Sequence, residues 1–195
     1  MNSYPKYGHP FEQGEIYHIY NRAIGNEDLF ISPDHYKYFL DRFHFYTREI
    51  LSVYAFCLLN NHFHFLVRIH NEVDSNLASE QLRRFFISYS KSFNKINNRR
   101  GSLFSKHLKS VKILTESQLL WTIYYIHRNP LHHGLTKNYK GYKWSSYRIL
   151  VSDKTTKLDK PAILELFKNK RELISFHDRN IKDDTLNKRI PILES

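Results

Sequence analysis

Two histidines separated by one residue offer the clearest chemistry in this sequence. His62 and His64 lie in the segment HFHFLVRI. Its residues form two alternating sets, as do the side chains on the two faces of a β-strand. Side chains two residues apart on a strand point to the same face, roughly 6–7 Å from each other, so both imidazoles can converge on one divalent ion. Phe63 and Phe65 would fill the opposite, buried face. An ordinary structural role for the pair stays open, because the chain contains 12 histidines.

A metal held by imidazoles still needs a nucleophile to cleave a phosphodiester. The segment that follows residue 115 predicts a helix over Glu116–Arg128, with a capping box at its start and the Asn129-Pro130 pair as its stop. Trp121, Tyr125 and Asn129 are four residues apart and therefore lie along one stripe of this helix. The stripe points a hydroxyl and an amide in the same direction.

The Tyr125 hydroxyl can attack phosphorus and form a covalent intermediate. The Asn129 amide oxygen is the type of ligand that magnesium and manganese prefer. Since the chain has 14 tyrosines and most tyrosines serve packing, residue chemistry alone does not select Tyr125. The spacing nevertheless makes a geometric prediction: Tyr125 and Asn129, and not Tyr124, face His62 and His64.

The elements that would position these groups follow the order strand, helix, strand, strand, helix, strand. They are predicted, in turn, at Ile16–Ile24, from Pro33 to about Arg48 or Glu49, at Leu51–Leu59, at His62–Ile69, around the apolar positions from Leu82 to Ile96, and at Leu103–Leu114. This order is that of an α+β, ferredoxin-like βαββαβ sheet. Both helices can then cover one sheet face and leave the His62/His64 face to the Glu116–Arg128 helix.

The length of 195 residues suits one domain with an appended tail. We expect the domain to span residues 1–150, closing with a short helical or irregular segment at Tyr142–Leu150. The polar stretch Lys154–Asp159 marks the boundary. Residues 151–195 form the tail, with one further helix expected over Pro161–Phe176.

A net charge of +11 and an aromatic content of 15% suit a protein that neutralises phosphates and stacks on bases. A basic protein whose lysines only keep it soluble is the alternative. Cys57 is the only cysteine, which excludes a disulfide or a cysteine-based zinc site within one chain. With no signal peptide and no apolar run of about 20 residues, we expect a cytoplasmic protein, nucleoid-associated when bound to DNA.

Several basic side chains are candidates for phosphate contacts. They are Arg83, Arg84, Arg99, Arg100, Lys106 and Lys109. For each of them a solvated surface position is the alternative reading. Arg22 and His107 could also point into the site.

Two motifs carry a resemblance to a known family. The segment Asn61–Val67, NHFHFLV, resembles the His-hydrophobe-His signature of HUH single-strand nucleases. The later segments YIHRNP at 125–130, Gly134-Leu135 and WSSY at 144–147 are similar to REP-associated tyrosine transposases, which are single-tyrosine HUH transposases. The similarity runs from about residue 16 to residue 147. The family commonly has a proline shortly before the histidine pair, where this chain has Asn60-Asn61.

The resemblance implies a ferredoxin-like nuclease that cleaves single-stranded DNA next to a hairpin. Tyr125 would form a 5′-phosphotyrosine, and His62, His64 and Asn129 would hold Mg²⁺ or Mn²⁺. No nucleotide cofactor and no membrane partner is implied. Both a homodimer that exchanges the tyrosine helix and a monomer stay open. The alternatives are a DNA- or RNA-binding protein that keeps the fold without the chemistry, and a metal-dependent phosphodiesterase that uses water.

Overall fold

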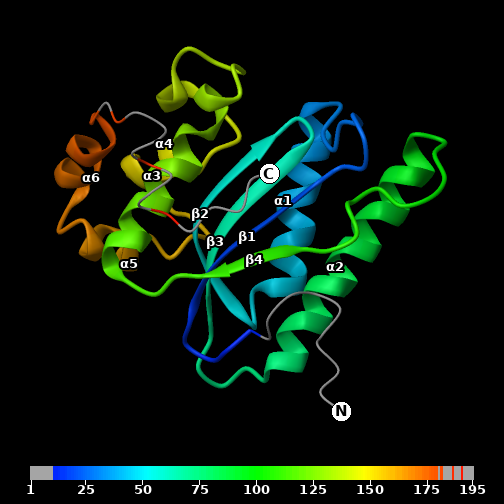
Figure 1. The fold of residues 1–195 in the computed structure, drawn as a ribbon, viewed down its shortest axis with the longest axis horizontal. Coiled ribbons are helices and arrows are strands. Elements are labelled where there is room, and N and C mark those ends of the chain that lie inside the picture. The colour runs from blue at the N-terminus through cyan, green and yellow to red at the C-terminus, as the bar shows by residue number, and fades with distance from the viewer. Residues whose placement is uncertain (1–10, 180, 182–185, 187–189, 191–195) are drawn as a thin grey trace.

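The structure, a computed structural model, describes residues 11–179, 181, 186 and 190. Its sheet and helices are shown in Figure 1. The elements are β1 (Ile16–Arg22), α1 (Pro33–Thr47), β2 (Leu51–Leu59), β3 (His62–Ile69), α2 (Ser75–Ile96), β4 (Lys109–Lys112), α3 (Glu116–His132), the 3₁₀ helix η1 (Tyr139–Gly141), α4 (Tyr147–Val151), α5 (Lys160–Leu166) and α6 (Lys170–His177).

The four strands form one sheet in the order β2-β3-β1-β4, and all neighbouring strands are antiparallel. This is the strand order of a ferredoxin-like βαββαβ sheet, so the predicted fold class is confirmed. The bounds of β2 and β3 agree with the prediction. The segment 144–146 adds backbone bonds along β2, since Leu58 N–H donates to the Trp144 carbonyl and Ser146 N–H donates to that of Phe56. It therefore covers the outer edge of β2.

The two faces of the sheet are covered by different helices. Helices α1 and α2 pack on one face, where the Phe65 ring stacks on Phe43 with centroids 4.1 Å apart. Helices α3 to α6 lie on the other side of the sheet (Figure 1). Alternation along β3 explains this division, because Phe63 and Phe65 belong to the first core whereas Leu66 belongs to the second.

Two strand predictions were too long. β1 ends at Arg22, and β4 is confined to Lys109–Lys112 instead of Leu103–Leu114. Phe104 makes only an isolated bridge to Ala23. The apolar residues before β4 are buried for another reason: Leu103 and Leu108 insert into the core under α1 and α2 from a loop. Their apolarity reflects core packing and not a continued strand.

Helix α3 begins as predicted, with the Thr115 hydroxyl accepting from Gln118 N–H. Its predicted end at Arg128 is wrong, because α3 continues through Pro130 to His132. Proline has a helix-compatible φ and removes only one N–H bond, so a helix near its end can tolerate it. The end of the helix is closed by the regular bond from His133 N–H to the Asn129 carbonyl.

The segment after residue 150 contains α5 and α6, so the single helix expected over Pro161–Phe176 is wrong. Lys168 adopts a φ of 68° between them, and the Asn169 side chain caps α6 by accepting from Glu172 N–H. Both helices pack toward α3, with Ile163 and Leu173 fully buried. The boundary at residue 150 stays a prediction.

Among the described residues, no helix is long and apolar enough to cross a membrane.

Candidate active site

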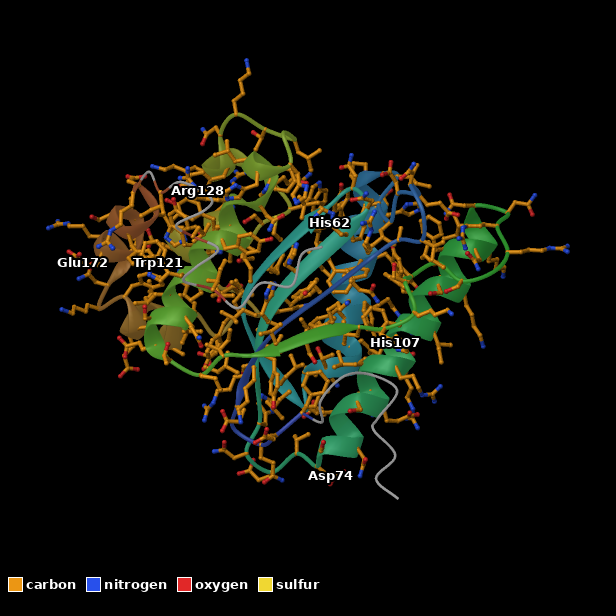
Figure 2. All side chains as sticks on the ribbon, in the orientation of Figure 1. His62, Asp74, His107, Trp121, Arg128 and Glu172 are labelled. Carbon is orange, nitrogen blue, oxygen red and sulfur yellow. The ribbon has the colours of Figure 1, made fainter. Side chains whose placement is uncertain are left out.

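His62 and His64, both on β3, line one cavity. His62 is half-buried and His64 is 1% exposed, and their rings lie perpendicular with centroids 5.3 Å apart. The cavity has a volume of about 500 Å³. It is lined by Tyr20, Asn21, Arg22, Asn61, His62, His64, Ser105, His107, Lys109 and His133. Figure 2 shows His62 on the sheet and His107 toward β4. Arg22 and His107 thus point into the site, as the sequence allowed.

Helix α3 presents Tyr125 to these histidines. The Tyr125 ring meets His64 edge-on with centroids 5.7 Å apart. Tyr124 turns away, and its hydroxyl donates to the Arg179 carbonyl at 2.7 Å. The predicted choice of Tyr125 over Tyr124 is therefore confirmed as geometry. One turn earlier, the indole of Trp121 packs on Phe176 of α6 with centroids 4.7 Å apart.

Asn129 completes this arrangement one turn after Tyr125. It is fully buried, and its amide lies close enough to His62 to oppose part of the lowering that burial imposes on the pKa of that imidazole. Neither amide atom of Asn129 makes a hydrogen bond to a described residue, and the Nε2 of His62 makes none either. The contact between the two side chains is therefore longer or less well aligned than an ordinary hydrogen bond. Tyr125 and Asn129 are both buried, and neither is among the residues that line the cavity.

Burial keeps the imidazoles of the site neutral. Loss of solvent lowers the pKa of His62 to about 4, an effect that His133 reinforces and the Asn129 amide opposes. Burial, followed by the nearby His18, holds the pKa of His64 well below its usual value. Burial also lowers the pKa of His18 to about 3. A neutral imidazole keeps the lone pair that a metal ion requires.

The donor set fits a divalent cation. The imidazoles of His62 and His64 and the amide of Asn129 lie together here, and buried polar atoms of His62 and Asn129 lack the partners that such groups normally have. Water or phosphate oxygens would fill the remaining positions of Mg²⁺ or Mn²⁺. Within the described part of the chain, no group of three or more His, Cys, Asp or Glu residues is arranged to hold a metal. Asn129 is therefore essential to the proposed set.

Three residues near the histidine pair were not found from the sequence. His18 lies on β1 with its Nε2 3.0 Å from His64 Nδ1. Tyr20 pairs with His64 across the strands and stacks on its ring. His133 reaches the cavity because α3 extends past Pro130, and its ring lies 4.6 Å from that of His62. Strand parity on β1, which puts His18, Tyr20 and Arg22 on one face, was the available signal.

The basic candidates divide between two hollows. Lys109 lines the histidine cavity, whereas Arg83 and Lys106 line a second hollow of about 330 Å³ against α2. Asn21 and Ser105 line both, so the two hollows adjoin. No acidic residue lines either one. Together the two hollows present the basic side chains of Arg22, Arg83, Lys91, Lys106 and Lys109.

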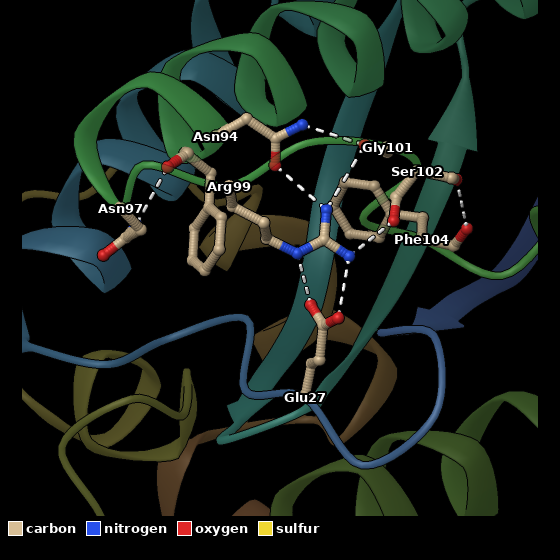
Figure 3. Close-up of polar contacts among 8 residues, drawn as sticks. Glu27, Asn94, Asn97, Arg99, Gly101, Ser102 and Phe104 are labelled. Carbon is tan, nitrogen blue, oxygen red and sulfur yellow. Dashed lines mark hydrogen bonds and ion pairs between the residues drawn. The ribbon is translucent and has the colours of Figure 1, made fainter.

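Some of the basic candidates bond to other residues of the protein, and Arg83 is one of them although it lines the second hollow. Arg99 makes a bidentate ion pair with Glu27 at 2.5 and 2.9 Å, and it also donates to the Asn94 side chain and to the carbonyls of Gly101 and Ser102 (Figure 3). The Arg99 side chain therefore links the loop after β1, which contains Glu27, to the loop between α2 and β4. Both Arg83 and Arg84 bond to Glu80, and Arg100 is exposed.

A chain of buried hydrogen bonds anchors the far side of α3. His177 Nδ1 lies 2.8 Å from the Leu173 carbonyl, which only accepts, so His177 Nε2 must accept from His127 Nδ1 at 2.8 Å. His127 Nε2 then accepts from the Ser146 hydroxyl at 2.8 Å. Ser146 in turn accepts from Phe56 N–H of β2. The chain links α6, α3 and the sheet, and it requires both imidazoles to be neutral.

The fold has a solved counterpart. The structure resembles that of a REP-associated tyrosine transposase bound to a REP hairpin, with a TM-score of 0.64 over 78% of this chain and 87% of the other. The two sequences are 15% identical, so the likeness is one of fold. No protein-family model and no curated protein matches the sequence.

Proposed function

We propose that this chain is a metal-dependent, single-stranded DNA endonuclease and strand transferase of the single-tyrosine HUH type. The observation that carries the proposal is the meeting of Tyr125 and Asn129 on α3 with His64 and His62 on β3. A resemblance in sequence motifs and a resemblance in fold to a hairpin-bound transposase independently support the same class. DNA that forms hairpins is the proposed substrate.

In the proposed reaction the Tyr125 oxygen attacks the scissile phosphorus. The bond from phosphorus to the 3′ oxygen breaks, and the proton lost by the tyrosine is balanced by the proton gained by the leaving 3′ oxygen. The products are a 5′-phosphotyrosine and a free 3′-hydroxyl. Because the phosphotyrosine conserves the bond energy, the hydroxyl of a second strand can reverse the step and join DNA without a nucleotide cofactor.

A divalent ion held by His62, His64 and Asn129 would stabilise charge on the phosphate oxygens. The protein's own contribution is positioning. Lys109 and Arg22, which line the cavity, would draw the scissile phosphate toward the histidines. Lys106 and Arg83 would hold the strand where it continues into the second hollow.

The test is covalent attachment to a labelled hairpin oligonucleotide with a single-stranded flank. The full-length protein should become attached in Mn²⁺ or Mg²⁺ and resist denaturing electrophoresis. Tyr125→Phe should lose attachment by at least about 1,000-fold, the scale of a removed nucleophile, while it still binds the hairpin. Tyr124→Phe is the matched control and should keep attachment, since its hydroxyl faces the Arg179 carbonyl.

The outcomes separate the alternatives. Attachment that persists in Tyr125→Phe would reject the nucleophile. Cleavage without attachment in the wild-type protein would favour a phosphodiesterase that uses water. Hairpin binding without cleavage in either metal would favour a binding protein that has kept only the fold.

A further inference from the structure

His18 occupies a place beside the histidine pair that the proposed chemistry does not use. It lies on β1, the strand next to β3, and its side chain is 2% exposed. Its Nε2 is 3.0 Å from Nδ1 of His64, which is 1% exposed. The two rings are nearly parallel, with centroids 5.2 Å apart. At this distance the two imidazole nitrogens form a hydrogen bond, so one of them carries a proton and the other accepts it.

The position of that proton decides what His64 can do. If the proton belongs to His64 Nδ1, the lone pair of His64 lies on Nε2 and is available to a metal ion. If it belongs to His18 Nε2, then a neutral His64 carries its proton on Nε2 and cannot donate that lone pair. His18 therefore acts on the site only through His64. It is absent from the residues that line the cavity.

The contacts of His62 give a precedent within the same site. Its Nδ1 is 2.7 Å from the Asn61 side-chain oxygen, and an amide oxygen only accepts. The proton of His62 is thus on Nδ1, and its Nε2 is left with a lone pair. His64 lines the same cavity, and because its Nδ1 is in contact with His18, only its Nε2 is left for a metal ion that His62 also binds. Metal-binding histidines generally have an acceptor at the other ring nitrogen for this reason.

We propose that His18 is a positioning residue that accepts a hydrogen bond from His64 Nδ1–H and holds His64 in the tautomer whose Nε2 can bind the ion. The inference rests on the proposed function for the identity of the ligand atom. Asn61 does the same for His62. The two ligands would thus be oriented by different acceptors, one from the turn before β3 and one from the neighbouring strand.

His18 also has packing contacts, and the test must distinguish them from orientation. Its ring stacks on Tyr20 with centroids 4.9 Å apart and meets Tyr125 edge-on at 6.1 Å. A substitution could therefore disturb the site by loosened packing alone. The tautomer of His64 is a readout that packing does not set.

The first measurement uses the metal-free, full-length protein labelled with ¹⁵N-histidine. Long-range ¹H–¹⁵N spectra at pH 7.5 distinguish the two tautomers, and His64→Gln assigns the His64 signals. We expect the proton of His64 on Nδ1. A proton on Nε2 would overturn the proposal, whether or not the protein binds metal.

The second measurement compares His18→Leu with His18→Gln by titration with Mn²⁺ alone, followed by electron paramagnetic resonance. Leucine removes the acceptor, and we expect Mn²⁺ to bind about 10- to 100-fold more weakly, as is usual when such a partner is lost. Glutamine can place an oxygen near the position of Nε2, so affinity should stay within a few-fold of wild type. Equal weakening in both folded variants, or none in His18→Leu, would contradict the proposal.

The two proposals fail in different ways. A wild-type protein with the expected His64 tautomer but no Tyr125 adduct would reject the strand transferase and leave the role of His18 in place. An adduct formed by a protein whose His64 carries its proton on Nε2 would reject the role of His18 alone.

Discussion

Helices cover both faces of the sheet, but the side chains that they bury differ in chemistry. Under α1 and α2, aromatic rings fill the space, as where Phe65 stacks on Phe43. Under α3, the buried side chains include His18, His64 and Asn129. His64 and Phe65 are neighbours on β3 and point to opposite faces of the sheet. The first face gains stability from burial, whereas the second holds groups whose burial costs free energy unless each is paired.

The largest expected difference between the faces concerns stability. Phe65→Ala should lower the free energy of unfolding by about 3–5 kcal/mol, because it leaves a cavity among rings that cannot close around it. His64→Gln, one residue away, should cost far less and should abolish Mn²⁺ binding. Urea denaturation of both variants checks the contrast. A loss in His64→Gln as large as that in Phe65→Ala would show that the histidine face also carries the fold.

A smaller effect should appear as pH dependence. Burial lowers the pKa of His177 to about 4 from an ordinary value near 6.5. The unfolded chain therefore takes up a proton that the folded chain excludes, so this contribution is complete above pH 6.5 and is lost as the pH falls toward 4. For one such histidine it amounts to roughly 2–4 kcal/mol.

Urea denaturation between pH 7.5 and 5 measures this contribution. His177→Gln should be less stable at neutral pH, because glutamine cannot reproduce both hydrogen bonds, but it should depend less steeply on pH than the wild type. Identical slopes for the two proteins would mean that His177 does not titrate with folding.

How much of this could be predicted from the sequence depended on regular spacing. The alternation of β3 predicted its two faces, and the four-residue spacing of Tyr125 and Asn129 predicted their common direction. Spacing failed where packing overrode local preference. Leu103 and Leu108 looked like strand residues although they fill the core from a loop, and Pro130 looked like a helix stop although tertiary contacts carry α3 beyond it.

The residues that contact the histidine pair could not be predicted from the sequence for a related reason. His18 is 46 residues away from His64 in sequence, and only the pairing of β1 with β3 brings them together. His133 reaches the cavity only because α3 is one turn longer than predicted. The identity of the ligands could be inferred from local pattern, but the residues that orient them could not.

The smallest expected effect concerns the boundary between the faces. Lys106 lines the second hollow, against α2. A DNA strand bound there would extend from the histidine cavity toward the side of the sheet that α1 and α2 cover. Lys106→Gln should weaken hairpin binding a few-fold and reduce the salt dependence by about one phosphate contact. Lys157→Gln, whose lysine pairs with Asp41, is the control and should change neither. Equal salt slopes for all three proteins would confine the DNA to the first cavity.

The hydrogen-bond chain behind α3 limits how that helix can turn about its own axis. Successive helical residues are separated by about 100°, so Tyr125 faces the sheet while His127, two positions later, faces α6. Any roll that displaced the Tyr125 hydroxyl would pull His127 away from both Ser146 and His177. The chain therefore works as a rotational lock. Through His177, helix α6 thus helps to fix the angle at which α3 holds Tyr125 beside His64.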